Sequence, residues 1–108
     1  MAIIFAQTDE GTFTLRKALY RMVLSRARRS VSDPADVETL QDYYEAVSLF
    51  RMEADERARV GDAILQGAVS LRADVLAGTP TEEPVRDGAA EYLGEFIEFM
   101  TSHLEDRR

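Results

Sequence analysis

The segment RMEADE, residues 51–56, decides how this chain folds, because the apolar pattern changes phase across it. Before the segment, apolar residues recur at helical spacing at Val37, Leu40, Tyr44 and Val47. After it, a second stripe with the same spacing contains Ile64, Ala68, Leu71 and Val75. The two stripes are about half a turn out of register, so one continuous helix would bury one and expose the other. We therefore predict a tight reversal within residues 51–56, with Asp55 as a candidate helix cap.

Two helices, 34–51 and 55–77, follow from this reversal. Asp33 can cap the amide groups of the first helix, and Pro34 is tolerated at its first position. The second helix should end at Gly78, which is followed closely by a proline.

Glycine inside the helix 55–77 needs an explanation, because it is a poor helix former. Gly61 shares a face with Ile64 and Ala68. We expect a neighbouring helix to approach closely at Gly61.

Two outer helices, 12–30 and 84–105, complete the pattern. The apolar arc of the first contains Leu15, Ala18, Leu19, Met22 and Val23. That of the last contains Val85, Ala89, Tyr92, Leu93, Phe96, Ile97, Met100 and Leu104. The segment TPTEEP, residues 79–84, reads as a linker between helices. We predict a single all-α domain over residues 1–108, folded as a four-helix up-and-down bundle.

The N-terminal residues 1–11 are expected to form an arm in front of this bundle, or a short hairpin that reaches into the first helix. The sequence AIIFAQTDEGTFTL, residues 2–15, could reverse at Asp9–Gly11. An isolated hairpin is marginal in water, so it would have to pack on the helices or on another chain. In either case we expect Ala2–Phe5 to be held against other apolar surface.

Composition limits the classes of protein that remain. The chain has 108 residues, 45% of them hydrophobic, and a net charge of -7, which fits one globular domain. There is no cysteine, so disulfides and thiolate metal sites are excluded. The longest apolar run is too short to span a membrane. We expect a cytoplasmic protein without membrane association, and its twelve arginines against one lysine favour a bacterial source.

Motifs for catalysis or cofactor binding are not evident. His103, the single histidine, has apolar residues one turn before it and is expected to be structural. Glu38, Asp42 and Glu45 align on one helix face, where carboxylates could hold a cation, although solvated faces look the same. No glycine-rich phosphate loop is present. We therefore expect no catalytic residue, no metal, no cofactor and no enzymatic activity.

The first helix is strongly basic, with six basic side chains and no acid between residues 12 and 32. Lys17, Arg21 and Arg28 lie opposite its apolar arc. Three interpretations compete: pairing with acids of the same fold or of a second subunit, an acidic macromolecular partner, or a solvated face. We prefer the first, because the acidic outer faces of the helices 34–51 and 84–105 offer a complement, the latter face with Glu91, Glu95 and Glu98.

Arg26 lies within the apolar arc of the first helix rather than on its basic face. Its stem could cover the core while the guanidinium reaches water. The alternative is a buried pair with an acid of another helix.

These features predict a small interaction protein, such as an adaptor, an inhibitor or an immunity-type protein. The candidate partner-binding residues are Lys17, Arg21, Arg28, Glu91, Glu95 and Glu98. The partner would be another protein or a second copy in a homodimer. The alternative is a small dimeric regulator that binds nucleic acid through the basic first helix, although the net negative charge opposes this.

Overall fold

Three helices and three short strands make up the part of the chain that the structure describes, residues 2–5, 12–32, 34–35, 46–48 and 52–105. In this computed structural model the order of elements is β1 (Ala2–Phe5), β2 (Thr12–Leu15), α1 (Lys17–Ser30), β3 (Ala46–Ser48), α3 (Ala54–Ala77) and α4 (Ala89–Glu105). The mainly helical fold is thus confirmed, with three helices in the described residues. The predicted count of four is not supported.

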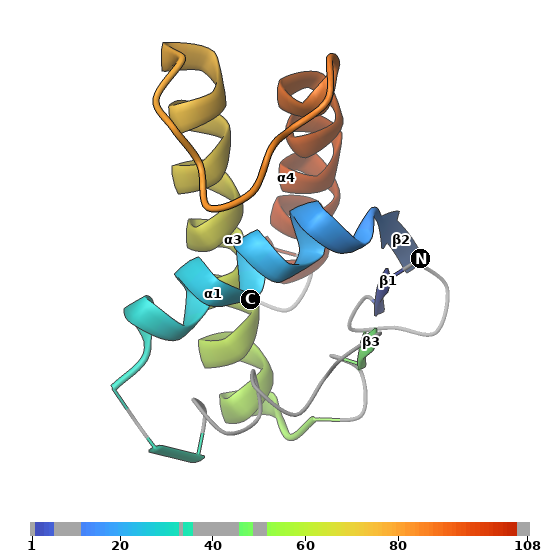
Figure 1. Ribbon diagram of the computed structural model, residues 1–108. Coiled ribbons are helices and arrows are strands. Elements are labelled where there is room, and N and C mark those ends of the chain that lie inside the picture. Colours follow the sequence, from blue (N-terminus) through green and yellow to red (C-terminus); the bar gives the residue numbers. More distant parts are fainter. Residues whose placement is uncertain (1, 6–11, 33, 36–45, 49–51, 106–108) are drawn as a thin grey trace.

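The helices do not form an up-and-down bundle. α3 and α4 run antiparallel as a hairpin, whereas α1 crosses in front of them (Figure 1). The predicted apolar arc of α1 faces this crossing, and its residues Leu19, Met22 and Val23 are buried, as is Leu15, the last residue of β2. From α3 and α4 the same core receives Ile64, Leu71, Leu93 and Phe96. The sequence therefore predicted which face of α1 is buried, but not the direction of the helix.

A glycine sets how closely α1 crosses α3. A Cβ added at Gly67 would lie 2.5 Å from the backbone oxygen of Val23 and 3.0 Å from the backbone nitrogen of Ala27. Any side chain would force the two backbones apart, so the crossing requires glycine here. This close approach lies at Gly67, about two turns after the one we expected at Gly61, which is itself buried in α3.

A three-stranded sheet replaces two predicted helical ends. β1 is its central strand and pairs antiparallel with β2, where Ala2 lies opposite Leu15, and parallel with β3, where Ile4 lies opposite Val47. The hairpin interpretation of the N-terminal segment is confirmed, and β1 is held on both sides by backbone pairing. The helix predicted over 12–30 begins only at Lys17, because β2 satisfies its backbone in the sheet.

The helix predicted over 34–51 is wrong at its C-terminal end, because Ala46–Ser48 is strand β3. Pro34 and Ala35 are helical, as expected for its start, while residues 36–45 lie outside the described residues. The predicted stripe residues Val37, Leu40 and Tyr44 fall in that range and so lie outside the described residues.

The predicted boundaries of α3 agree closely with the structure. The helix begins at Ala54, so a helix start within 51–56 is confirmed, although Glu53 occupies the cap position and Asp55 lies inside the first turn. At the other end Gly78 adopts a left-handed conformation with φ 73°. Its N–H donates to the oxygen of Val75, and that of Thr79 donates to the oxygen of Asp74. These two hydrogen bonds satisfy the last carbonyl groups of the helix. The glycine followed by a proline had predicted that the helix ends here.

Candidate functional site

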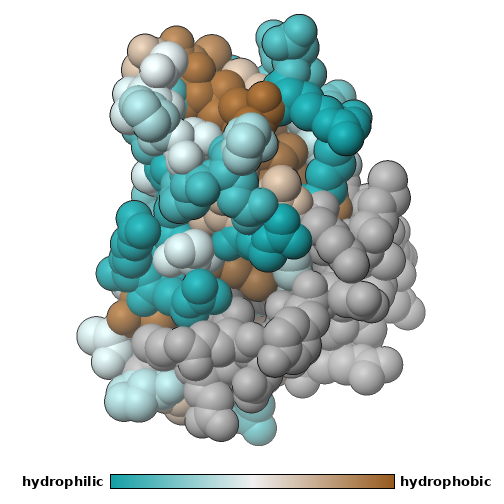
Figure 2. Space-filling model, in the orientation of Figure 1, coloured by the Kyte–Doolittle hydropathy of each residue, from teal (hydrophilic) through white to brown (hydrophobic). Residues whose placement is uncertain are grey.

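The linker between α3 and α4, residues 78–88, takes a detour that builds the candidate site. It leaves the end of α3, descends to α1 and climbs back to the start of α4 (Figure 1). Hydrophilic residues cover the middle of this face, where the linker meets α1, while apolar residues lie at the end of α3 (Figure 2). Two arginines of α1 hold the linker in this position.

Arg26 is the buried member of this contact, with only 8% of the residue exposed. Its Nε and Nη2 donate to the two carboxylate oxygens of Glu82, at 3.2 and 2.7 Å. Its Nη1 donates to Ser70 Oγ at 2.9 Å and to Asp74 Oδ2 at 2.6 Å. The buried-pair interpretation of Arg26 is confirmed, and one partner, Asp74, belongs to another helix as proposed.

The hydrogen bond from Arg26 lowers the pKa of the Glu82 carboxyl, against the opposing effect of burial. The same bond raises the pKa of the Arg26 guanidinium, again against burial. Both groups are therefore charged when they meet, which makes the hydrogen bonds charge-assisted and strong.

Arg21 is the exposed member of the contact. Its Nε and Nη2 donate to the two carboxylate oxygens of Glu83, at 2.8 and 2.6 Å. The Arg21 side chain is 57% exposed and that of Glu83 33% exposed. The hydroxyl of Thr81 donates to the backbone oxygen of Glu83 at 2.6 Å and steadies the linker. We refer to the pairs of Arg21 and Arg26 with the linker acids as the arginine clamp.

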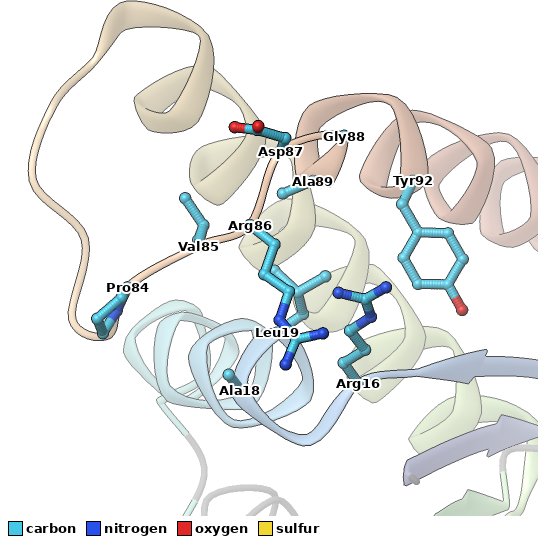
Figure 3. A pocket seen from close by; sticks show the side chains of 10 residues that line it. All are labelled: Arg16, Ala18, Leu19, Pro84, Val85, Arg86, Asp87, Gly88, Ala89 and Tyr92. Carbon is cyan, nitrogen blue, oxygen red and sulfur yellow. The ribbon is translucent and has the colours of Figure 1, made fainter.

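Beyond the clamp, the linker covers a pocket of about 670 Å³ between the first turn of α1 and the start of α4 (Figure 3). Its lining residues are Arg16, Ala18, Leu19, Pro84, Val85, Arg86, Asp87, Gly88, Ala89 and Tyr92. Arg86 extends from the linker towards α1, and Arg16 extends from the start of α1 towards α4. Leu19 lies between them, so charged groups and apolar surface share one pocket.

Tyr92 borders the pocket on the α4 side. Partial burial raises the pKa of its hydroxyl, the charge of Glu95 raises it further, and the positive charge of Arg16 lowers it. The phenol therefore stays neutral at physiological pH and can donate a hydrogen bond. The carboxylate of Asp87 points away from the two arginines in Figure 3.

The predicted basic residues are used in different ways. Arg21 is bound to the linker of its own chain. Arg28 is half-buried near the end of α1 and forms no ion pair with a described residue. Lys17 is the first residue of α1, and its side chain lies outside the described part.

The predicted acidic residues Glu91, Glu95 and Glu98 are all exposed on α4. None of them forms an ion pair with a residue that the structure describes. Among the described side chains, this acidic stripe is therefore not paired with the basic helix of the same chain. The acids that do pair with α1 come from the end of α3 and from the linker.

The other candidates from the sequence concern metal binding and membrane association. Within the described residues no group of three potential ligands could hold a metal ion. Glu38, Asp42 and Glu45 lie outside those residues, as does the side chain of His103. Among the helices of the described ranges, none has the length and apolar character needed to cross a membrane.

No protein-family model, curated protein or solved structure matches this chain. The site must therefore be judged from its own geometry.

Proposed function

We propose that this protein is a non-enzymatic interaction protein, of the adaptor, inhibitor or immunity type, which binds a basic protein surface through α4. The observation that carries the proposal is the exposed acidic stripe of α4, Glu91, Glu95 and Glu98, which has no cationic partner among the described residues.

The opposite face of α4 fixes the direction of this stripe. Leu93, Phe96 and Met100 are fully buried in the core, so α4 cannot rotate without exposing them. The three glutamates thus remain directed at solvent. Exposed like charges on one rigid face attract an oppositely charged surface from about a Debye length away, roughly 10 Å at 0.1 M salt.

A second copy of the chain is one candidate for the basic partner. Arg28 and Arg29 lie in the last turn of α1 and have no ion-pair partner among the described residues. In a two-fold dimer, the end of α1 in each subunit could contact the acidic stripe of the other.

The clamp weighs against the nucleic-acid alternative. Arg21 and Arg26 are bound to carboxylates of their own chain, so fewer cations of α1 are free to contact phosphates. A net charge of -7 adds long-range repulsion.

A charge-neutral variant of the stripe tests the proposal. Glu91→Gln, Glu95→Gln and Glu98→Gln are introduced together, and the control carries Asp55→Asn, Glu56→Gln and Asp62→Asn on α3. Self-association is measured by sedimentation equilibrium, and partner capture from the native cell is measured between 0.05 and 0.5 M salt.

We expect the stripe variant to lose association or capture that the control retains, and higher salt to weaken it. Equal binding by parent, stripe variant and control would refute a role for the stripe. Binding of generic DNA at low salt, with a steep loss as salt rises, would favour the nucleic-acid alternative.

A further inference from the structure

Arg16 and Arg86 differ from the two arginines of the clamp. Both line the pocket under the linker, yet no described carboxylate lies within ion-pair distance of either one. They come from distant segments, the residue before α1 and the linker, and extend towards each other from opposite sides (Figure 3). Two exposed positive charges repel unless something between them compensates.

The arginine clamp explains why Arg16 and Arg86 line the same pocket. Glu82 and Glu83 are held on α1 by Arg26 and Arg21, so the following linker residues must lie across the first turn of α1. Gly88, with φ 87°, then turns the chain into α4. Arg86 is thereby placed over the start of α1, where it lines the pocket together with Arg16.

The apolar lining shows that the pocket suits more than an inorganic ion. Leu19 forms its floor, Val85 and Ala89 line its sides, and the ring of Tyr92 closes one end. A volume of about 670 Å³ lies in the range that accommodates small organic molecules. Such a ligand would place its apolar part on this surface and its charge between the arginines.

The charge of the site favours a particular anion. A guanidinium presents parallel N–H donors that match two oxygens of a phosphate or carboxylate group. Two guanidinium groups offer two such forks, which a phosphate monoester can accept with three oxygens and a charge of about -1.5 to -2. The start of α4 adds a favourable partial positive charge.

We propose that this pocket binds a small organic phosphate monoester, with the phosphate between Arg16 and Arg86 and an apolar or aromatic group on Leu19, Val85 and Ala89.

Titration calorimetry with phenyl phosphate tests this assignment directly. Inorganic phosphate and benzoate serve as comparison ligands. The double variant Arg16→Gln with Arg86→Gln removes the proposed anion contacts, and Arg57→Gln with Arg59→Gln removes the same charge near the start of α3, outside the pocket. Circular dichroism verifies that both variants keep the parent fold, and methyl NMR shifts of Leu19 and Val85 locate the ligand.

We expect phenyl phosphate to bind the parent and the control equally, and to bind the pocket variant at least about tenfold more weakly, because charged hydrogen bonds are lost. The methyl shifts of Leu19 and Val85 should move only in the parent and the control. Inorganic phosphate and benzoate should both bind more weakly than phenyl phosphate.

Three results would overturn the proposal. Absence of binding at millimolar phenyl phosphate would remove the site. Equal affinity for inorganic phosphate would remove the organic part of the assignment, and equal affinity for benzoate would remove the preference for phosphate. An unchanged affinity in the folded pocket variant would show that the arginines do not hold the anion.

Discussion

Arg21 and Arg26 lie on one helix and bind neighbouring glutamates of one linker, but their surroundings differ sharply. Each places two nitrogens on the two oxygens of a carboxylate. The side chain of Arg26 is only 9% exposed, whereas that of Arg21 is 57% exposed. The same pairing chemistry therefore operates in two different environments of a single contact.

This difference shows which part of the clamp is obligatory. Arg26 lies among buried residues of α1, and without its partners a charge would be left away from water, which is very unfavourable. Arg21 and Glu83 can each exchange their partner for water with little penalty. The buried pair should therefore hold the linker, while the exposed pair refines its position.

The largest effect should come from Arg26→Ala, which leaves Asp74 and Glu82 without their shared partner. Breaking a buried pair typically costs about 3–5 kcal/mol, and both acids are about one-third exposed, so we expect about 3 kcal/mol. Urea denaturation of the parent, Arg26→Ala and Arg21→Ala measures the free energy of unfolding. An equal loss for both arginines would break the distinction between them.

A smaller loss is expected at the other contact of α1, its crossing with α3. Gly67→Ala places a Cβ against the backbone of Val23, and overpacking of this kind costs about 1–3 kcal/mol. The matched control is Gly94→Ala, where the nearest atom belongs to the flexible end of Arg72 at 3.3 Å. The control should be neutral or gain up to about 1 kcal/mol from helix propensity. A similar gain at Gly67 would disprove the close crossing.

The linker acids should make stability depend on pH. The pKa of the Glu82 carboxyl lies below its ordinary value of 4.5, chiefly because Arg26 donates to it. The folded state then binds fewer protons than the unfolded state, so this contribution is complete above about pH 4.5 and is lost as pH falls through the folded pKa. Denaturation between pH 6 and pH 3 should show a steeper decline for the parent than for Arg26→Ala. If stability declined in parallel with pH for the parent and Arg26→Ala, the Arg26–Glu82 pair would not contribute to the acid dependence of stability.

The smallest effect is expected from Arg21→Gln. Its pair with Glu83 is largely solvated, so the denaturation midpoint should shift much less than for Arg26→Ala. High salt should remove what difference there is, because exposed charges are screened. A shift that persists at 1 M salt would mean that Arg21 acts through packing instead of charge.

Much of the helical structure could be predicted because its signals are local. The start of α3 near residue 54, the stop at Gly78 and the buried face of α1 all depend on residues within a few turns of one another. The strands could not be predicted in the same way. Leu15 fits the apolar arc of a helix as well as it fits a strand, and its pairing with Ala2 decides between them.

Of the candidate site, the sequence predicted only the pairing of Arg26, as one of two alternatives. The position of Arg26 within the apolar arc of the first helix allowed two interpretations, a stem that covers the core or a buried ion pair. The structure contains the ion pair. Its partner Glu82 could not be named, because the position of that residue depends on the path of the linker over α1. Arg16 and Arg86 are 70 residues apart, with α1 and α3 between them, so no local pattern indicates that they line one pocket.

The central position of β1 affects the order in which the chain can assemble during synthesis. Ile3 pairs with Ala46 across about 40 residues of intervening chain, which takes roughly 2–8 s to translate. Until β3 emerges from the ribosome, the hairpin of β1 and β2 presents an open edge that can pair with other chains. Slow translation between these strands should therefore favour aggregation of the nascent protein until β3 pairs with β1 and covers that edge.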